Sequence, residues 1–172
     1  MVNKEKNFAS AVIYVHNAEK TIEKFLGTII EVMQLNFEHS EIICVNDASD
    51  DSSIGKIKKV SEVASTTSVS VVNMSYFHGL ELAMNAGVDM AIGDFVFEFD
   101  NTNPDFDRNV IMQIYCRSLE GYDIVSATPD RKEKFTSRLF YKVFDRFSDI
   151  KYKMTTESFI CGVWIKNRQC KI

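Results

Sequence analysis

The sequence has few of the features that mark a linker-rich, membrane-spanning or secreted protein. Its 172 residues include only two prolines and seven glycines, which leaves little room for linkers and favours one domain over residues 1–172. No stretch holds the ~20 uninterrupted apolar residues of a membrane span. The polar start, Met1 to Asn7, lacks the apolar segment of a signal peptide. These absences favour a globular protein that works in the cytoplasm.

Basic residues are too few for a dedicated nucleic-acid surface. Lysine and arginine number 20 against 24 aspartates and glutamates, and the formal net charge is −4. A protein that binds nucleic acid needs a positive face that neutralises phosphates. We therefore expect no nucleic-acid partner, although residues 131–146 form a local region in which basic and aromatic side chains alternate.

The cysteines show neither a metal-binding nor a disulfide pattern. Cys44, Cys116, Cys161 and Cys170 include no CxxC pair, and no histidine stands at zinc-ligand spacing. Cys44 lies in an apolar run, where cysteine usually acts as a small buried hydrophobe. Free thiols of this kind indicate a reducing compartment.

Apolar runs of strand length alternate with segments of helical periodicity. This alternation predicts a mainly parallel sheet covered on both faces, that is, a three-layer α/β/α sandwich. Right-handed crossovers then bring the loops after Val15, Val45 and Phe99 to one edge of the sheet, where ligands bind in such folds. The predicted strands cover residues 8–15, 41–45, 69–73, 95–99 and 122–127, and the predicted helices cover 19–35, 53–64, 76–91 and 107–119.

The loops at this edge resemble those of family 2 glycosyltransferases. The family's first strand ends in a Pro-Val-Tyr-Asn-Glu type turn, and residues 14–19 read Tyr-Val-His-Asn-Ala-Glu. Its second strand ends in an Asp-Asp-Gly-Ser-x-Asp-x-Ser type loop, and residues 46–52 read Asn-Asp-Ala-Ser-Asp-Asp-Ser. The motifs follow one another in the family's order and at its spacing over residues 8–127. This makes the resemblance more specific than a match to any single short motif.

Two further motifs of the family follow in the same order. Its Asp-x-Asp metal motif at the end of the fourth strand is represented by Asp100-Asn101-Thr102. The family's helix with Gly, Ala, Asn-x-Gly and a Gly-Asp stop corresponds to Gly79, Ala83, Asn85, Gly87, Ala91, Gly93 and Asp94.

The resemblance implies a fold and a reaction. The fold is the GT-A type, and the reaction transfers a sugar from a UDP or GDP sugar, with inversion, in cell-envelope polysaccharide biosynthesis. Asp100 and Thr102 are implied to hold Mg or Mn, weakly and with help from the diphosphate, because hard cations prefer oxygen ligands. Base recognition falls to Asp47, and no catalytic base is identified. The implied nucleotide-sugar-binding residues are Tyr14, Val15, His16, Asn17, Glu19, Asp47, Gly79, Asn85 and Asp100.

The tail resembles one branch of the family, the dolichol-phosphate-mannose-synthase-like group. Residues 128–172 are interpreted as its acceptor-side or juxtamembrane segment, and a polyprenyl phosphate or a glycan as the acceptor. Residues 134–148 are expected to form an amphipathic helix that binds anionic lipid, which would place the protein at the inner face of the membrane. Because the chain stops at Ile172, short of a complete enzyme of this family, we expect it to be a fragment.

Several positions depart from the family pattern. Thr102 replaces a metal-motif carboxylate, Asn46 replaces an aspartate and Tyr14 replaces a proline. Residues 157–160, Glu-Ser-Phe-Ile, stand where the lipid-carrier branch has a Gly-Asp-Phe-Arg type segment. These departures favour an alternative, a non-catalytic nucleotide-sugar sensor or partner subunit with the same fold. A receiver-like phosphoacceptor domain, suggested by the aspartates of the 46–52 loop, leaves the helix with the Asn-x-Gly motif unexplained.

Structural interpretations stand beside these functional ones. Asp51 or Ser52 is expected to cap the next helix, and Gly79 and Gly87 to let a helix approach the sheet closely. His16 is also consistent with a packing role at the rim of the site. His39 and His78 are interpreted as structural. Asp47 is expected on the loop surface, so that its replacement would leave the fold intact.

Overall fold

The computed structural model describes residues 4–103, 107–122, 124–127 and 161–165. The helix expected over residues 134–148 and the segment 157–160 therefore lie outside the described residues. In the part of the chain that is described, none of the helices has both the length and the apolar character needed to cross a membrane.

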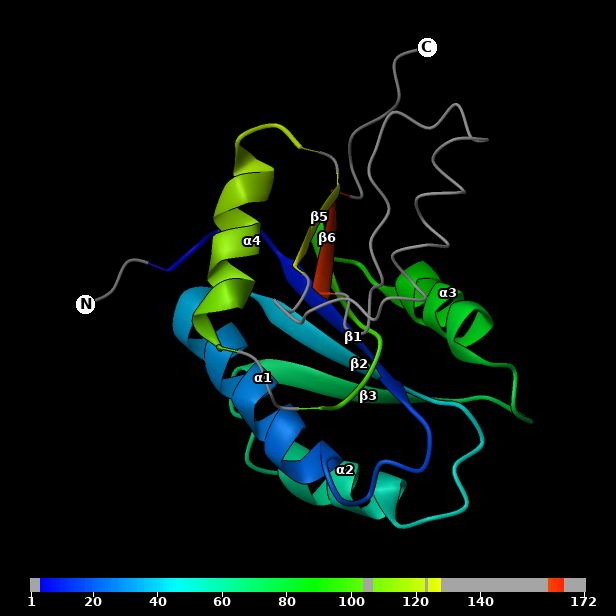
Figure 1. The fold of residues 1–172 in the computed structure, drawn as a ribbon. Helices are drawn as coiled ribbons and strands as arrows, with labels where there is room; N and C mark the ends of the chain where they lie inside the picture. The colour runs from blue at the N-terminus through cyan, green and yellow to red at the C-terminus, as the bar shows by residue number, and fades with distance from the viewer. Residues whose placement is uncertain (1–3, 104–106, 123, 128–160, 166–172) are drawn as a thin grey trace, which may run out of the picture.

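A six-stranded sheet forms the centre of the molecule (Figure 1). Strands β3 (Thr67–Asn73), β2 (Ser40–Asn46), β1 (Ala9–Val15) and β4 (Phe95–Phe99) are parallel neighbours in that order. β6 (Cys161–Ile165) runs antiparallel between β4 and β5 (Ile124–Ala127). The mainly parallel sheet is confirmed. β6 was not predicted from the sequence, because it is a five-residue run with an internal glycine and no helical pattern beside it.

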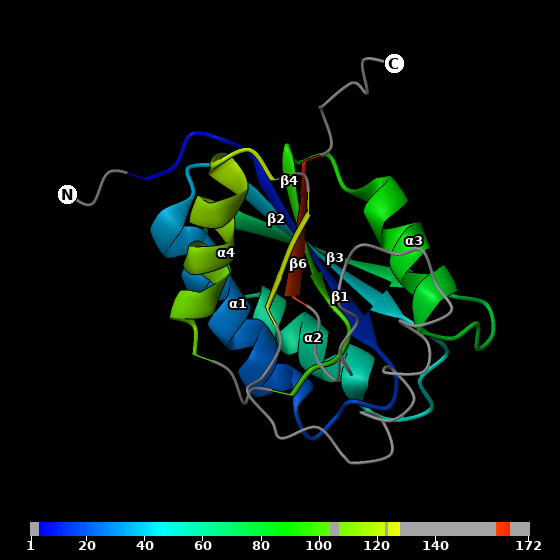
Figure 2. The same cartoon turned by 45° about the horizontal axis from the view of Figure 1, so that its top comes forward.

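Helices cover both faces of the sheet, which confirms the three-layer α/β/α sandwich. Apolar side chains of α1 (Ile22–Asn36), α2 (Ser53–Ser61) and α4 (Asn109–Leu119) share one core with the sheet. α3 (Leu80–Met90) packs on the opposite face, over β1 and β2. Figure 2 shows α3 standing apart from the other three helices, across the sheet.

The larger core is rich in aromatic rings. The ring of Tyr115 is buried, and its centroid lies 5.1 Å from that of Phe37 and 5.0 Å from that of Phe95, with both pairs edge to face. Such pairs add about 0.5–1.5 kcal/mol to the area they bury. Cys44 lies in the same core, as expected, and burial raises the pKa of its thiol to about 12. The core holds β1, β2 and β4 in fixed register, and so fixes the loops that follow them.

The smaller core requires a close approach of α3 to the sheet. A Cβ atom on Gly87 would lie 2.6 Å from Cγ2 of Val45 and closer still to Cγ1 of Val12, both buried valines. Only a residue without a side chain fits there, which confirms the packing interpretation of Gly87. Because β1 and β2 carry these valines, the contact sets the height of α3 above both strands.

α3 begins four residues later than predicted. The periodicity placed its start at residue 76, whereas Gly79 is the N-cap, with φ 84° and ψ 167°. A positive φ interrupts the helical backbone and is readily adopted by glycine. Residues 74–79 consequently form a loop, and this loop reaches the functional edge of the sheet.

Candidate functional site

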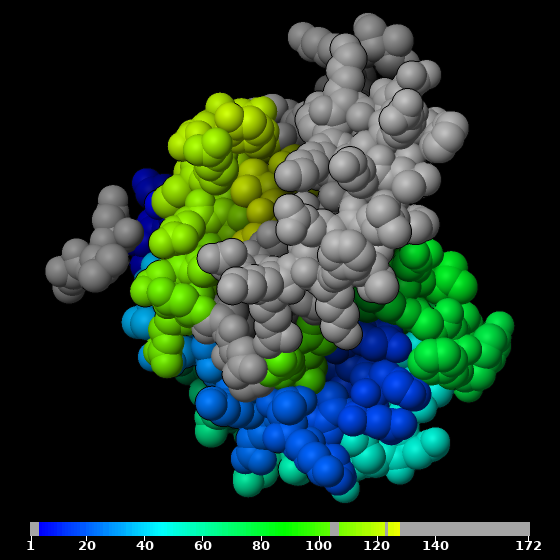
Figure 3. Space-filling view, in the orientation of Figure 1, coloured from blue at the N-terminus to red at the C-terminus, as the bar shows by residue number. Residues whose placement is uncertain are grey.

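Three loops meet at the carboxyl ends of the parallel strands, and two of them, the loops after β1 and β2, were predicted at this edge from the sequence. We call residues 16–21, after β1, the first loop; residues 47–52, after β2, the second loop; and residues 74–79, before α3, the third loop. Hydrogen bonds join the second loop to both of the others. In Figure 3 dark blue, cyan and green residues from these parts of the chain border one another on one side of the molecule.

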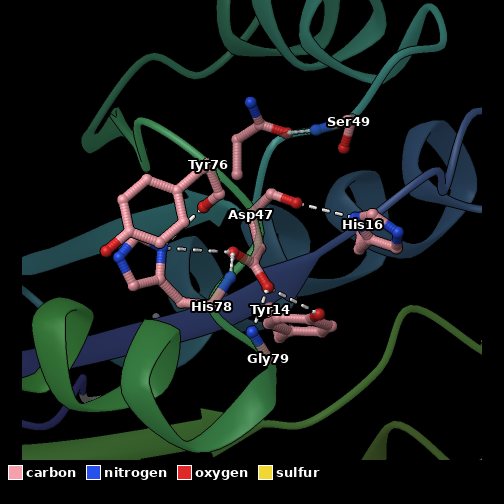
Figure 4. A network of polar contacts seen from close by, with 8 residues as sticks. Tyr14, His16, Asp47, Ser49, Tyr76, His78 and Gly79 are labelled. Carbon is pink, nitrogen blue, oxygen red and sulfur yellow. Dashed lines mark hydrogen bonds and ion pairs between the residues drawn. The ribbon is translucent and has the colours of Figure 1, made fainter.

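Asp47 is the centre of this junction (Figure 4). Its side chain is 0% exposed, and three groups donate to its carboxylate. The backbone N–H of His78 donates to Oδ1 at 2.8 Å, and the backbone N–H of Gly79 donates to Oδ2 at 2.9 Å. The Tyr14 hydroxyl also donates to Oδ2, at 3.0 Å. The expectation of a surface carboxylate was wrong, because the third loop folds over the second and buries Asp47.

Tyr14 comes to Asp47 from β1, one strand away. Burial raises the pKa of its phenol to about 12, with further contributions from the hydrogen bond to Asp47 and from the carboxylate charge. The hydroxyl is therefore protonated at neutral pH and acts as a donor to the carboxylate. A proline, usual at this position in the resembling family, could not make this bond.

His16 has its ring tautomer fixed by two contacts. Its Nδ1 lies 2.6 Å from the backbone carbonyl oxygen of Asp47, which can only accept, so Nδ1 carries the proton. The Asn17 side-chain amide nitrogen lies 3.4 Å from Nε2, which accepts from it. The His16 ring also meets the Phe77 ring, with centroids 4.7 Å apart and planes at 55°. Both ring nitrogens of His16 are thus hydrogen-bonded within the first and second loops.

The third loop supplies residues that the sequence did not predict for the site. The ring of His78 stacks on that of Tyr76 at 4.0 Å, and its Nδ1 donates to the Tyr76 carbonyl oxygen at 2.6 Å. Tyr76 and Phe77 are 66% and 58% exposed, which is unusual for aromatic side chains. These residues directly precede Gly79, which matches the family's motif, and this position is the signal in the sequence that could have identified them.

Asn17 and Glu19 join the first loop to the second. Asn17 Oδ1 accepts from the backbone N–H of Asp50 at 2.9 Å, and Glu19 Oε2 accepts from that of Ser52 at 3.3 Å. The backbone N–H of Asn17 donates to the Ser49 hydroxyl at 3.0 Å. Both side chains thus have structural partners, and their part in ligand binding stays a prediction.

The sequence left Asp51 and Ser52 as alternative caps of α2, and in the structure Asp51 is the cap. Its Oδ1 accepts from the backbone N–H of Ser53 at 2.9 Å, whereas Ser52 makes no side-chain cap bond. Its Oδ2 accepts from the backbone N–H of Glu19 at 2.9 Å. Burial works to raise the pKa of Asp51, but these bonds and that from the Ser53 hydroxyl outweigh it, so the pKa is lowered.

Ala48 has an unfavourable backbone conformation, with φ 51°. A non-glycine residue in the left-handed region costs about 1–2 kcal/mol, and the resembling family has glycine here. We expect Ala48→Gly to raise the free energy of unfolding by about 1 kcal/mol, measured by urea denaturation. Ala86→Gly, in the middle of α3, is the control and should lower it by about 1 kcal/mol. A loss of stability in both variants would contradict the strain at Ala48.

Asp100 and Asn85 share a cavity beside the three loops. The cavity has a volume of about 340 Å³ and lies between α3 and the end of β4. It combines apolar and carboxylate groups, as ligand sites usually do. Its lining residues are Leu80, Glu81, Met84, Asn85, Glu98 and Asp100. The structure thus brings Asp100 and Asn85 together, as the family resemblance implied, beside Gly79 at the N-cap of α3.

Thr102 and Val15 are placed differently from the other candidate residues. Thr102 is buried, and its hydroxyl oxygen lies 2.6 Å from that of Thr21 in the first loop. Val15 is buried as well, and its carbonyl oxygen accepts from the backbone N–H of Asp47 at 2.8 Å. The described residues contain no group of three His, Cys, Asp or Glu side chains that could hold a metal ion. Metal ligation by Thr102 stays a prediction.

Comparison with protein families gives a match to the glycosyl transferase family 2 model over residues 10–102. An uncharacterized glycosyltransferase of Synechocystis is 33% identical over 87% of this chain and 48% of its own length. A prophage bactoprenol glucosyl transferase homolog of Escherichia coli is 28% identical over 87% of this chain and 50% of its own. The chain spans about half the length of the curated relatives it matches.

Solved structures share the fold. The glucosyl-3-phosphoglycerate synthase of Mycobacterium tuberculosis, in complex with Mn²⁺, UDP-glucose and phosphoglyceric acid, superposes with a TM-score of 0.66. It is 14% identical, and the match covers 92% of this chain and 57% of that one. Sequence identity at this level establishes the architecture alone, which is the GT-A type expected from the resemblance.

Proposed function

This chain belongs to glycosyl transferase family 2, and we propose that it is the donor-binding half of an enzyme that transfers a sugar from UDP or GDP to a polyprenyl phosphate. The observation that carries the proposal is the meeting of three loops beside a cavity that holds Asp100 and Asn85. Ligands of open α/β sheets bind at this edge. The bactoprenol relative supports a polyprenyl phosphate over a glycan as the acceptor.

We propose which part of the site binds each part of the donor. The nucleoside lies against the first and third loops, where His16, Phe77 and Tyr76 offer rings. The sugar and diphosphate lie toward the cavity, where the Asn85 amide can bind sugar hydroxyls. Gly79 presents backbone without a side chain at the N-cap of α3, which lets a phosphate or ribose approach closely.

Asp100 fits a divalent cation that binds together with the donor diphosphate. It supplies a carboxylate oxygen, the ligand that Mg²⁺ and Mn²⁺ prefer, and it lines the cavity. The Thr102 hydroxyl is hydrogen-bonded to Thr21, so it adds no charge. When bound, such a cation stabilises the charge of the departing nucleoside diphosphate. The metal motif itself supplies one carboxylate, so the diphosphate must supply further oxygens to the cation.

The transfer is a direct displacement at the anomeric carbon. An oxygen of the acceptor forms the new bond to that carbon, while the bond to the nucleoside diphosphate breaks on the opposite side and the configuration inverts. A polyprenyl phosphate is already anionic, so the reaction needs no strong general base. The acceptor lies in a membrane, so we also propose that the protein acts at the cytoplasmic membrane face.

A non-catalytic nucleotide-sugar sensor is the second candidate function. The specific observation in its favour is Thr102, which stands in the metal motif but bonds to Thr21 inside the fold. A sensor needs to bind the donor but does not need to stabilise a leaving diphosphate. The two functions therefore differ in the expected role of the metal.

Calorimetric titration with UDP and GDP tests the metal-assisted site. We expect Mn²⁺ to tighten binding of the preferred nucleotide at least about tenfold, or ~1.4 kcal/mol, relative to EDTA. Asp100→Ala should remove this enhancement, because it removes the carboxylate that faces the diphosphate. Asp89→Ala, which removes an exposed carboxylate on α3, is the matched control and should retain it.

The same titrations separate the two functions. Equal affinity in EDTA and Mn²⁺, together with no effect of Asp100→Ala, would reject metal-assisted transfer in favour of the sensor. Release of UDP or GDP from a nucleotide sugar on addition of polyprenyl phosphate would support the enzyme directly.

A further inference from the structure

We propose that the edge strand β3 pairs with β3 of a second copy of this chain, antiparallel to it and related to it by a two-fold axis at Ser70. β3 is the last strand on one side of the sheet, beside β2 (Figure 1). Ser70 is the middle residue of this strand, away from the third loop that follows its carboxyl end. The inference therefore goes beyond the proposed function and does not depend on it.

The free edge of β3 carries backbone groups that can bind another strand. The N–H of Met74 donates to the carbonyl oxygen of Asn46 on β2 at 2.9 Å, and in a strand every second residue directs its N–H and C=O to the same side. Val69, Val71 and Asn73 therefore direct these groups away from β2. None of the described residues hydrogen-bonds them, so this edge can receive a further strand.

The edge has none of the features that usually prevent such pairing. Edge strands are commonly protected by charged side chains, by proline or by bulges. Residues 63–80, which include β3 and the segments on both sides of it, contain no Asp, Glu, Lys, Arg or Pro, although 26% of the whole chain is charged. The pairing of β3 with β2 is continuous from Thr67 to Asn73, without a bulge. An identical uncharged edge matches it, because no like charges meet across the axis.

Antiparallel pairing about Ser70 matches both the backbone and the side chains. Val69 lies opposite Val71 of the second copy, and each such pair exchanges two hydrogen bonds, about four in all. Both valines are partly exposed and pack against the larger core. Valine opposite valine extends this core across the axis. The neighbouring registers instead place one of the two valines opposite Asn73 or the buried Thr67.

The pairing ends at two chains and leaves both donor sites open. A two-fold contact uses the same edge on both copies, so no β3 edge remains for a third chain. Because the two strands run in opposite directions, the three loops of each copy lie at opposite ends of the dimer. Neither site is covered by the other copy, and only one of the two can face a given membrane surface.

Analytical ultracentrifugation of the full chain tests the pairing. We expect a wild-type mass approaching twice 19.7 kDa at chain concentrations up to about 100 µM. Ser70 is exposed, and its hydroxyl donates to the carbonyl oxygen of Ile42 at a long 3.4 Å, so a charged replacement costs the fold little. Ser70→Lys and Ser70→Glu each place like charges directly opposite one another, and each should weaken the dimer at least about fivefold.

An equal mixture of Ser70→Lys and Ser70→Glu is the sharpest test. Lysine lies opposite glutamate in the mixed dimer, so its affinity should return to within about threefold of the wild type. Ser126→Lys, the same change at an exposed serine of the opposite edge strand β5, is the matched control and should leave the dimer intact. A wild type that stays monomeric, a dimer that resists both Ser70 variants, or a mixture that does not recover overturns the pairing.

Nucleotide titrations keep this test separate from the proposed function. UDP or GDP affinity should be the same in Ser70→Lys, Ser70→Glu and the wild type, because Ser70 lies outside the three loops. Unchanged affinity also shows that both variants are folded when their dimer is lost. A chain that dimerises as described but binds neither nucleotide would contradict the proposed function alone.

Discussion

Replacing Asp47 by alanine is expected to lower the free energy of unfolding by about 3 kcal/mol and to abolish nucleotide binding. The variant leaves the Tyr14 hydroxyl and the N–H groups of His78 and Gly79 without their acceptor. An unpaired buried donor costs about 1–3 kcal/mol, and water that enters the vacated space offsets part of the sum. The same change releases the third loop, which carries Phe77 to the proposed nucleoside site.

Chemical denaturation monitored by circular dichroism gives the stability change. Asp50→Ala is the matched control, because Asp50 is exposed in the same loop. Its backbone N–H, which the substitution retains, makes the hydrogen bond to Asn17. We expect less than about 0.5 kcal/mol for this control. If Asp47→Ala is as stable as the wild type, the carboxylate does not help to hold the third loop, and the structural role that we assign to Asp47 is wrong.

The repeating part of the fold could be predicted from the sequence. β4 was predicted with its observed bounds, because its apolar run ends at a helix stop on one side and at Asp100 on the other. The late start of α3 could not be, since residues 76–79 continue a helical spacing and only the backbone of Gly79 interrupts it. β6 could not be either, because its place in the sheet depends on pairing with strands distant in sequence.

The sequence predicted which loops lie together better than how the residues in those loops are held. Loops after β1, β2 and β4 were expected at one edge because parallel strands with right-handed crossovers require it. The burial of Asp47 depends on the third loop, and nothing in the second loop's own residues indicates it. The same holds for Thr102, whose hydroxyl bonds to Thr21, 81 residues earlier in the chain.

Two glycine-to-alanine changes in helices are expected to have opposite effects. Gly87→Ala would place a methyl group 2.6 Å from Cγ2 of Val45 and closer to Cγ1 of Val12, so α3 must move away from the sheet. Overpacking of this kind costs about 1–3 kcal/mol or more, and the better helix propensity of alanine recovers about 1 kcal/mol. We expect a net loss of about 2 kcal/mol.

Gly27→Ala in α1 isolates the propensity term, because a Cβ atom there meets nothing within 4 Å. It should raise the free energy of unfolding by about 0.5–1 kcal/mol, so the two variants differ by about 3 kcal/mol in urea denaturation. Because α3 carries Gly79 at its N-cap, its displacement in Gly87→Ala also pulls a donor away from Asp47. Nucleotide affinity should therefore fall in Gly87→Ala and hold in Gly27→Ala. Equal stabilities of the two variants would mean that α3 does not need the close approach at Gly87 to hold the third loop over Asp47.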